Sequence, residues 1–273
     1  MAGVVLKMRR LLPLALTLGL ALAAQTPAAP HLNQGGNLPV TAAIPDDPEL
    51  ARVIAPLAAQ IRASFGRVIA TAPDGMARWA GPGEFPLGFL LADVMRAGAA
   101  RAVGGEVRLA FTNNGGIRRD LPVGPVHVGD LYEVMPFDNE LVVADYTGAE
   151  VLAIVKEAIQ RRGGEPISGI RVALTGTPQQ PVLAVTWADG SAFDPAGTYR
   201  VATSDYLLAN GDATPSLKKG RNVVLTSIPV RQLLIDWCEA QGKASQPIRA
   251  PEGGRYTFAP EIAAAIGART FHY

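Results

Sequence analysis

The sequence predicts a single α+β domain in which helices pack against a mixed or antiparallel sheet. Three observations support this class. Short apolar runs bounded by Gly, Pro, Asn and Asp recur along most of the chain, as strands do. Between them lie amphipathic segments that begin with capping residues. The chain has 273 residues, of which 48% are hydrophobic, and this is enough to bury one substantial core.

Residues 1–24 have the pattern of a secretory signal peptide. Lys7, Arg9 and Arg10 precede an apolar run that ends in small residues. A membrane span needs roughly 20 apolar residues in a row, and Pro13 interrupts this shorter run. We therefore expect cleavage, no stable membrane span afterwards, and export to the periplasm, the cell envelope or the medium.

Charge and cysteine content restrict the possible partners. Three of the 25 Lys and Arg residues lie in the predicted signal, so the remaining 22 face 24 Asp and Glu, for a net charge of about −2. This near-neutral balance gives no indication of a nucleic-acid polymer or an anionic membrane surface as partner. The single cysteine, Cys238, lies beside Trp237 on a helical pattern, which indicates a buried structural thiol rather than a nucleophile.

The first part of the mature chain is predicted to contain a linker and two helices. Residues 25–45 are rich in Ala, Pro and Gly without periodicity and predict a flexible linker, so the domain would occupy residues 46–273. A helix is expected from Asp46 to about Ala63, with an apolar side formed by Leu50, Ile54, Leu57 and Ile61. A strand over 65–71, a loop over 72–82 and a helix from Glu84 to about Gly98 follow.

The stretch from Leu109 to Glu157 organises the chain. A buried strand over 109–111 leads directly into Asn113, Asn114, Gly115 and Gly116. Two glycines leave the backbone amides open to a bound oxygen, and Arg118 supplies a cation with planar donors. The same residues are typical of an ordinary Asn-Gly turn, and local chemistry leaves both interpretations open.

The second half of this stretch predicts a turn, a strand and a helix. Residues 135–139 form a turn that carries an aromatic side chain, followed by a strand over 141–146. Thr147 and Glu150 have capping-box spacing, and the helix that they begin has one apolar face. We interpret the basic pair Arg161 and Arg162, which precedes two glycines, as a solvated C-terminal cap.

The C-terminal third is predicted to add strands and one further helix. Strands are expected over 170–174, 182–187 and 198–203, and their succession favours antiparallel pairing. The remaining elements are a strand over 223–226, a helix capped by Ser227 and ending near Gln241, a strand over 255–258, and an added helical turn in the tail 259–273.

Three motifs together carry a resemblance to a known family. They are the Asn-Gly-Gly-Ile-Arg sequence at 114–118, the sequence VGPVHVGDLYEVMPFDN at 123–139, and the segment 204–212 with sequence SDYLLANGD. As a set, they resemble the C-terminal domain of the 5′-nucleotidase/UDP-sugar hydrolase family, from about Glu84 to Phe258.

The resemblance implies a nucleotide-binding site. Phe137 and Tyr206 would clamp the base, with stacking worth about 1–3 kcal/mol per base, and Asp212 would bind ribose hydroxyls. Asn113, the glycines and Arg118 would orient the sugar and phosphate. Without the resemblance, Tyr206 and Asp212 would be interpreted as a core aromatic and a turn residue. The full set of expected substrate-binding residues is Asn113, Gly115, Gly116, Arg118, Phe137, Tyr206, Asn210 and Asp212.

The chain departs from the family pattern at two places. Pro86 stands where family members have an arginine that binds the phosphate or ribose end of the ligand, which leaves Arg118 and the neighbouring Arg119 as candidate cations. After Asp212 the family continues with glycine and an aromatic residue, whereas this chain has the unrelated sequence of 213–219.

We expect no catalytic residue, metal site or cofactor in this chain. Its three histidines, His31, His127 and His272, include no pair at ligand spacing, and no Gly-x-Ser-x-Gly motif is present. In the resembled family a separate metallophosphatase domain with two metals performs the hydrolysis.

The sequence therefore favours an exported nucleotide-recognition domain that takes part in nucleotide dephosphorylation with a metallophosphatase on a separate chain, which would hold the divalent metal. The alternatives are a stand-alone nucleoside or nucleotide-binding protein of the envelope and a structural domain with a decayed pocket. Whether the chain is itself an enzyme stays open.

Overall fold

The computed structural model describes residues 41–273. The predicted signal peptide lies outside the described residues, as does all of the predicted linker except its last five positions, which contain a turn. Within the described part, no helix combines the length and the apolar character needed to cross a bilayer.

The first described helix is solvent-exposed along most of its length, and at its end the half-buried Phe65 packs against the core. α2 (Pro48–Phe65) begins where Asp47 Oδ1 accepts hydrogen bonds from the backbone N–H groups of Glu49 and Leu50, at 2.8 and 3.1 Å. Its predicted apolar side is present, but none of its residues is buried. The chain divides into two compact units within this helix, and the larger unit, Val53–Tyr273, contains all the strands described below.

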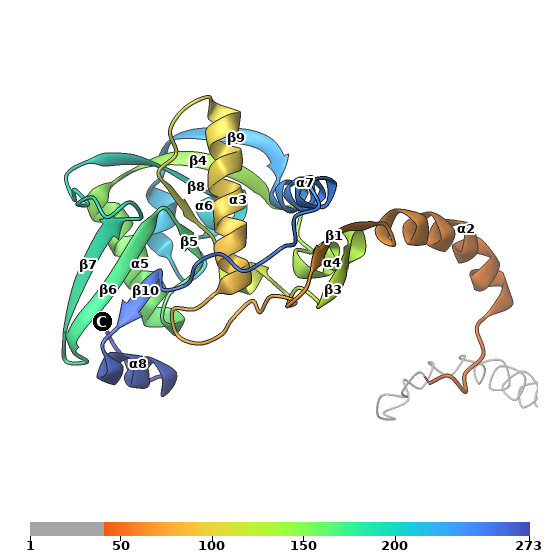
Figure 1. Cartoon of the computed structure of the whole chain (residues 1–273), viewed down its shortest axis with the longest axis horizontal. Helices are drawn as coiled ribbons and strands as arrows, with labels where there is room; N and C mark the ends of the chain where they lie inside the picture. The colour runs from red at the N-terminus through yellow and green to blue at the C-terminus, as the bar shows by residue number, and fades with distance from the viewer. Residues whose placement is uncertain (1–40) are drawn as a thin grey trace, which may run out of the picture. The chain divides into compact units, whose positions relative to one another are not determined.

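Three sheets form the larger unit (Figure 1). The largest has five strands in the order β5 (Ile167–Ser168), β2 (Leu109–Phe111), β8 (Thr198–Ser204), β4 (Glu140–Thr147) and β9 (Arg221–Pro229). A second has the order β10 (Tyr256–Phe258), β6 (Ile170–Thr177) and β7 (Gln180–Trp187), and β1 (Val68–Ala72) pairs with β3 (Gly124–His127). The predicted α+β class with mixed sheets is confirmed.

Strand β8 does not follow the predicted pairing. Antiparallel pairing with its predecessors in sequence was expected, and this prediction is correct only for β6 with β7. Instead β8 lies between β2, to which it is parallel, and β4, to which it is antiparallel. Its last four residues are all buried. A position between two other strands gives their backbone N–H and C=O groups hydrogen-bond partners and keeps their side chains away from solvent.

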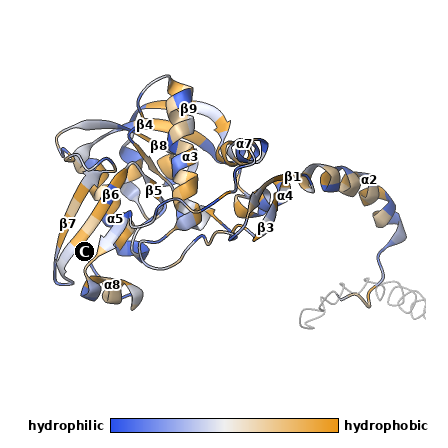
Figure 2. Ribbon diagram, in the orientation of Figure 1, coloured by the Kyte–Doolittle hydropathy of each residue, from blue (hydrophilic) through white to orange (hydrophobic). Residues whose placement is uncertain are grey.

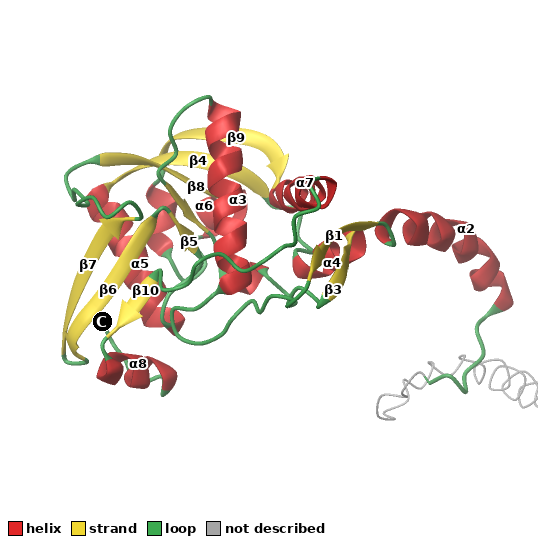
Figure 3. Cartoon of the chain, viewed as in Figure 1, coloured by secondary structure: helices red, strands yellow, loops and turns green. Residues whose placement is uncertain are grey.

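Helices α3 (Pro86–Val103) and α7 (Val230–Lys243) cover the five-stranded sheet and contact each other (Figure 3). α3 continues five residues past the predicted end at Gly98. Gly98 does not end the helix but lets Leu233 of α7 pack against it. A Cβ there would lie 2.8 Å from Leu233 of α7. The predicted cap at Ser227 is wrong: Ser227 lies within β9 with φ 54°, and α7 begins after Pro229.

Helix α5 (Gly148–Arg162) follows the prediction closely. Thr147 Oγ1 accepts from the N–H of Glu150 at 3.3 Å, and Glu150 Oε2 accepts from the N–H of Thr147 at 2.8 Å, so the capping box is confirmed. A hydrogen bond from Arg221 holds the pKa of Glu150 at about 2. The predicted apolar face is buried, and the helix ends at Gly163 with φ 80°.

Short helical segments complete the fold, and only the last of them, in the C-terminal tail, was expected. α4 (Val128–Val134) follows β3, with a capping box between His127 and Asp130. The others are α6 (Asp205–Asn210), α8 (Pro260–Gly267) and the 3₁₀ segments η1 (Asn114–Gly116) and η2 (Pro215–Lys219).

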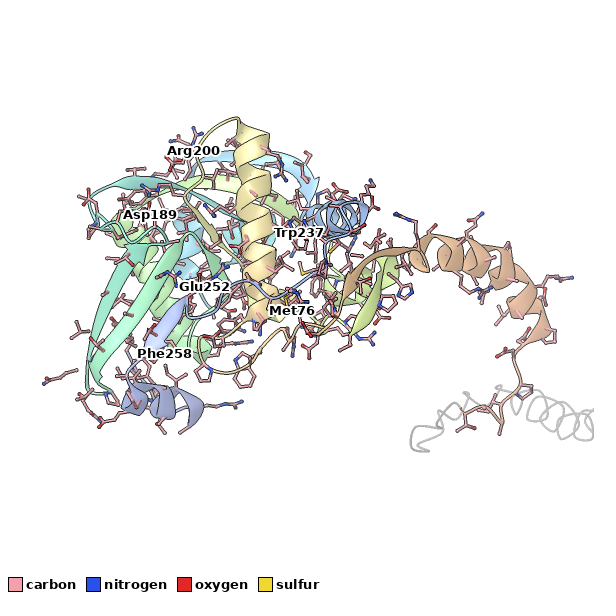
Figure 4. All side chains as sticks on the ribbon, viewed as in Figure 1. Met76, Asp189, Arg200, Trp237, Glu252 and Phe258 are labelled. Atoms are coloured by element: carbon pink, nitrogen blue, oxygen red, sulfur yellow. The ribbon has the colours of Figure 1, made fainter. Side chains whose placement is uncertain are left out.

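Two apolar clusters form the interior, and Figure 2 shows hydrophobic residues along the strands that contribute to them. The first contains residues of α3, α7 and β1 together with the buried Met76 of the loop after β1, and Trp237 packs against it (Figure 4). Cys238 also belongs to it, so the predicted burial of this thiol is confirmed, and the burial raises its pKa to about 12. The second cluster contains residues of α5, β6 and β10, and Phe258 packs against it (Figure 4).

A pair of glycine variants tests the contact of α7 with β1. A Cβ at Gly242 would lie 1.9 Å from the carbonyl oxygen of Ile69, whereas a Cβ at Gly267 meets no atom within 4 Å. We expect Gly242→Ala to lower the free energy of unfolding by at least about 2 kcal/mol, because the backbone of β1 must move. Gly267→Ala should raise it by up to about 1 kcal/mol. Urea denaturation of both variants measures this, and equal effects would contradict the packing described.

Candidate functional site

The segments that carry the predicted site residues join the five-stranded sheet at one edge, where the strands β2 and β8 end and β4 begins. Leu141 of β4 lies opposite Ser204 of β8 in an antiparallel pair, so β4 begins where β8 ends. Ala110 of β2 lies opposite Ala202 of β8 in a parallel pair, so these two strands end together. The loop after β2, the turn before β4 and helix α6 after β8 therefore emerge at the same edge.

The glycine loop forms a 3₁₀ turn that is fixed at both ends. Asn114 donates its backbone N–H to Glu165 Oε2 at 2.6 Å, and Arg118 Nη1 donates to the carbonyl oxygen of Gly115 at 2.9 Å. Neither Gly115 nor Gly116 has positive φ, so the backbone conformation of this loop does not by itself require glycine. Their contribution is space, since a Cβ at Gly116 would lie 3.0 Å from Asn113 Oδ1.

One predicted cation contacts an aromatic residue of the site, and the other pairs with a carboxylate. The Arg118 guanidinium carbon is 5.9 Å from the centroid of the Phe137 ring, close enough for a cation–π contact. Arg119 instead forms an ion pair with Glu133 of α4 in which both side chains are exposed, so its role as a cation of the pocket stays a prediction.

The two predicted clamp aromatics are open to solvent. Phe137 and Tyr206 are each 43% exposed, which is high for large aromatic side chains. Tyr206 follows the last residue of β8 by two positions, and Phe137 precedes the first residue of β4 by three. They therefore project from neighbouring strands at the same edge, and in residues 41–273 no ring contact joins them.

A buried arginine, which sequence reasoning missed, holds the Phe137 turn. Arg231 of α7 donates to the carbonyl oxygens of Met135 and Phe137, at 2.8 and 3.1 Å, and forms an ion pair with Asp138. Its guanidinium lies over the ring of Tyr132, 4.1 Å from the centroid. The only sequence signal is a charged residue on the buried face of an amphipathic helix.

Asp205 joins the two aromatic segments and was also missed. Its Oδ1 accepts from the backbone N–H of Glu140, where β4 begins, at 3.0 Å, and from the N–H of Tyr206 at 2.7 Å. One carboxylate thus fixes the start of β4 relative to the residue that carries the second ring.

Asp212 lies between the glycine loop and α5. Its Oδ2 accepts from Asn113 Nδ2 at 3.1 Å and from Arg161 Nη1 at 2.7 Å. Partial burial raises the pKa of this carboxyl, but the hydrogen bonds from Arg161 and Asn113 outweigh it and hold the pKa below its usual value. Arg161 is therefore more than the solvated helix cap that we predicted, since it contacts a candidate site residue.

Asn210 and Pro86 are the two positions from the sequence analysis that remain to be placed. Asn210 Nδ2 donates to the carbonyl oxygen of Tyr206 at 3.0 Å within α6, so its ligand role stays a prediction. Pro86 is the first residue of α3 and offers no donor. A different cation lies near the glycine loop: Arg78, from the loop before α3, donates to the carbonyl oxygen of Ile117 at 2.7 Å.

Glu165 is a buried carboxylate that supports the glycine loop. Its side chain is 2% exposed, and Oε2 bonds to Asn114 as described above. Oε1 has no hydrogen-bond partner among the described residues, and Arg162 Nε lies 3.8 Å away. Burial raises the pKa of this carboxyl, and the hydrogen bond from Asn114 opposes the rise.

No candidate metal centre is present in the part of the chain that the structure describes. No group of three or more His, Cys, Asp or Glu side chains there is placed to hold a metal ion. His127 Nδ1 lies 3.0 Å from Asp130 at the start of α4, which is a capping arrangement.

Comparison with known proteins identifies the domain type. A family model described as "5′-nucleotidase, C-terminal domain" matches residues 68–219, more than half of the chain. A cell wall protein of Listeria monocytogenes, Lmo0130, is 31% identical over 187 residues, covering 64% of this chain and 24% of that protein. The trifunctional nucleotide phosphoesterase YfkN of Bacillus subtilis is 36% identical over 150 residues, covering 51% and 10%.

Comparison with solved structures indicates the same domain type. The 5′-nucleotidase precursor of Thermus thermophilus superposes with a TM-score of 0.65 at 28% identity, over 80% of this chain and 45% of that one. The chain thus spans less than half the length of each of these three proteins.

The raised pKa of Glu165 predicts a pH-dependent stability. A carboxyl with a pKa above its unfolded value stabilises the fold when protonated, and this contribution is lost as pH rises from about 4.5 through the folded pKa. The unfolding free energy of the wild type minus that of Glu165→Gln should therefore fall over this range. Thermal or urea denaturation at several pH values measures it. A difference that does not change with pH would contradict the buried, partly unpaired carboxylate.

Proposed function

The chain belongs to the family of 5′-nucleotidase C-terminal domains, and from this premise we propose that it recognises a nucleoside or nucleotide at the edge where β2, β4 and β8 meet. The observation that carries the proposal is this convergence. Three chain segments that carry binding groups leave the sheet side by side. They supply an amide and a cation, an aromatic ring, and a second ring followed by a carboxylate.

The groups at the edge match the parts of a nucleotide. Phe137 and Tyr206 are exposed rings that do not contact each other, which is what a base-stacking pair needs before its ligand arrives. Arg118 uses one N–H on Gly115 and keeps further donors for an anionic oxygen. The two contacts of Asp212 both involve Oδ2, so Oδ1 can accept from ribose hydroxyls.

We propose further that the protein acts in nucleotide dephosphorylation, with the catalytic step performed by a metallophosphatase on a separate chain. Two similar proteins are named as phosphoesterases, which supports this role: the 5′-nucleotidase precursor of Thermus thermophilus and the nucleotide phosphoesterase of Bacillus subtilis. In this proposal the present chain orients the base, sugar and phosphate, and the divalent metals of the partner activate water. Export is part of the proposal and is supported by the Listeria relative, which is a cell wall protein.

Two observations favour a second candidate, a domain of this fold whose pocket has decayed. Asp212 already pairs with Arg161, and Pro86 provides no donor at the start of α3. A ligand that uses Asp212 must therefore compete with, or include, an existing ion pair. Direct binding measurements separate the two candidates.

The aromatic pair gives the first binding test. Phe137→Ala and Tyr206→Ala should each weaken adenosine binding by about 1–3 kcal/mol, because each removes one stacking face. Val182→Ala, at a position on β7 that is 59% exposed, is the matched control and should bind as the wild type does. Isothermal titration calorimetry with adenosine and AMP measures the affinities. Absence of wild-type binding at millimolar ligand would favour the decayed pocket, and normal binding by both variants would refute the clamp.

Reconstitution tests the role in dephosphorylation. The purified chain alone should not release phosphate from AMP, whereas a mixture with an exported metallophosphatase and a divalent metal should. Phe137→Ala should lower the rate of the mixture, mainly through a higher KM, because it weakens base binding in substrate and transition state alike. If the chain binds adenosine but no mixture is active, a stand-alone binding protein becomes the better account.

A further inference from the structure

A cavity adjoins the glycine loop at Asn114 and is lined by neither of the two exposed rings nor by Arg118. It has a volume of about 910 Å³. Its walls come from the loop before α3, the glycine loop, the end of α5, and α8 with the C-terminal tail. The tail contributes Ile266, Gly267, Arg269, Phe271 and His272, all outside the residues that the family model matches.

The cavity is held together by close packing at the end of α5. Gly163 ends this helix with φ 80°, and a Cβ there would lie 2.7 Å from Ile266 of α8 and 3.0 Å from Pro82 of the loop before α3. Lys156 of α5 lies 4.9 Å from the centroid of the Tyr273 ring, which fixes the very end of the tail. The walls are therefore parts of one packed structure.

The lining carries an excess of positive charge. Four arginines, Arg78, Arg161, Arg162 and Arg269, face a single carboxylate, Asp120, which accepts from the backbone N–H of Arg78 at 2.8 Å. Arg161 and Arg162 have acidic neighbours in Asp212 and Glu165. In residues 41–273, neither the Arg78 nor the Arg269 guanidinium has a carboxylate within 4.0 Å.

A buried polar group without a partner also lines this cavity. Asn114 is only 3% exposed, and its Oδ1 has no hydrogen-bond partner among the described residues. An unpaired buried polar atom costs free energy unless a ligand or water completes it. Trp79 at the cavity wall is 51% exposed, and it offers an aromatic face beside the arginines.

We propose that this cavity is a second binding site that takes a phosphate group, either free phosphate or the phosphate of a nucleotide. Arg78 and Arg269 bind the anionic oxygens as charge-assisted donors, and a protonated phosphate oxygen donates to Asn114 Oδ1. Occupancy of this site does not depend on nucleoside binding at the sheet edge. The two sites are neighbours, since Arg161 lines the cavity and also pairs with Asp212.

The proposal is tested by titrating the purified full chain with inorganic phosphate, with AMP and with adenosine, using calorimetry and ¹H–¹⁵N NMR. Phosphate should bind and shift the Asn114 amide and the Arg161 side-chain signals. Arg78→Ala and Arg269→Ala should each weaken phosphate binding about tenfold, the loss of one charge-assisted contact. Arg269→Lys should recover part of that loss. Arg171→Ala, at an exposed arginine of β6 that pairs with Glu252, is the matched control and should have no effect.

Each outcome decides the matter. Weaker phosphate binding in Arg78→Ala and Arg269→Ala, with normal adenosine binding in Arg269→Ala, supports the second site. If AMP binds more weakly in those variants and inorganic phosphate does not bind to the wild type, the phosphate is that of a nucleotide. No phosphate or AMP response in the wild type overturns the proposal. So does binding that is lost in Arg118→Ala but unchanged in Arg78→Ala and Arg269→Ala, because it would place the phosphate at the sheet edge.

Discussion

The antiparallel register between β4 and β8, with β2 parallel on the other side of β8, is the constraint on which the site depends. It brings together segments that are about 100 residues apart in the chain, such as Asn113 and Asp212, which are hydrogen-bonded at 3.1 Å. A slip of one residue would turn every side chain of β8 to the other face of the sheet. The last four residues of β8 are buried on both faces, so a slip would exchange the side chains that pack on the two sides of the sheet.

Arginines from distant elements then fix the loops at this edge. Arg231 of α7 holds the Phe137 turn, Arg161 of α5 holds Asp212, and Arg78 holds the end of the glycine loop. In the first and last of these contacts the guanidinium donates to backbone carbonyl oxygens, which no side-chain pattern reveals. The loops themselves need little regular structure, since their conformation is set by helices that already belong to the core.

Much of the fold could be predicted from the sequence because the signals are local. The capping box of Thr147 and Glu150, the buried face of α5 and the end of that helix at Gly163 all depend on residues within one or two turns. Most strands follow from apolar runs for the same reason, but β3 and β5 were not predicted, and the strand expected over 65–71 begins only at Val68. The failures concern contacts between distant segments. Gly98 resembles a helix end in the sequence because its packing partner, Leu233, lies on another helix, and the neighbours predicted for β8 are wrong because strand pairing is non-local.

The backbone conformation of Asp212 affects which substitutions this position tolerates during evolution. Asp212 adopts φ 48°, a left-handed conformation that costs a non-glycine residue of order 1 kcal/mol and that glycine adopts freely. Substitution by glycine would relieve this strain and at the same time remove the carboxylate that binds Asn113 and Arg161. Relief of the strain and loss of these two contacts oppose each other, so the carboxylate can persist in a conformation that the polypeptide does not favour by itself.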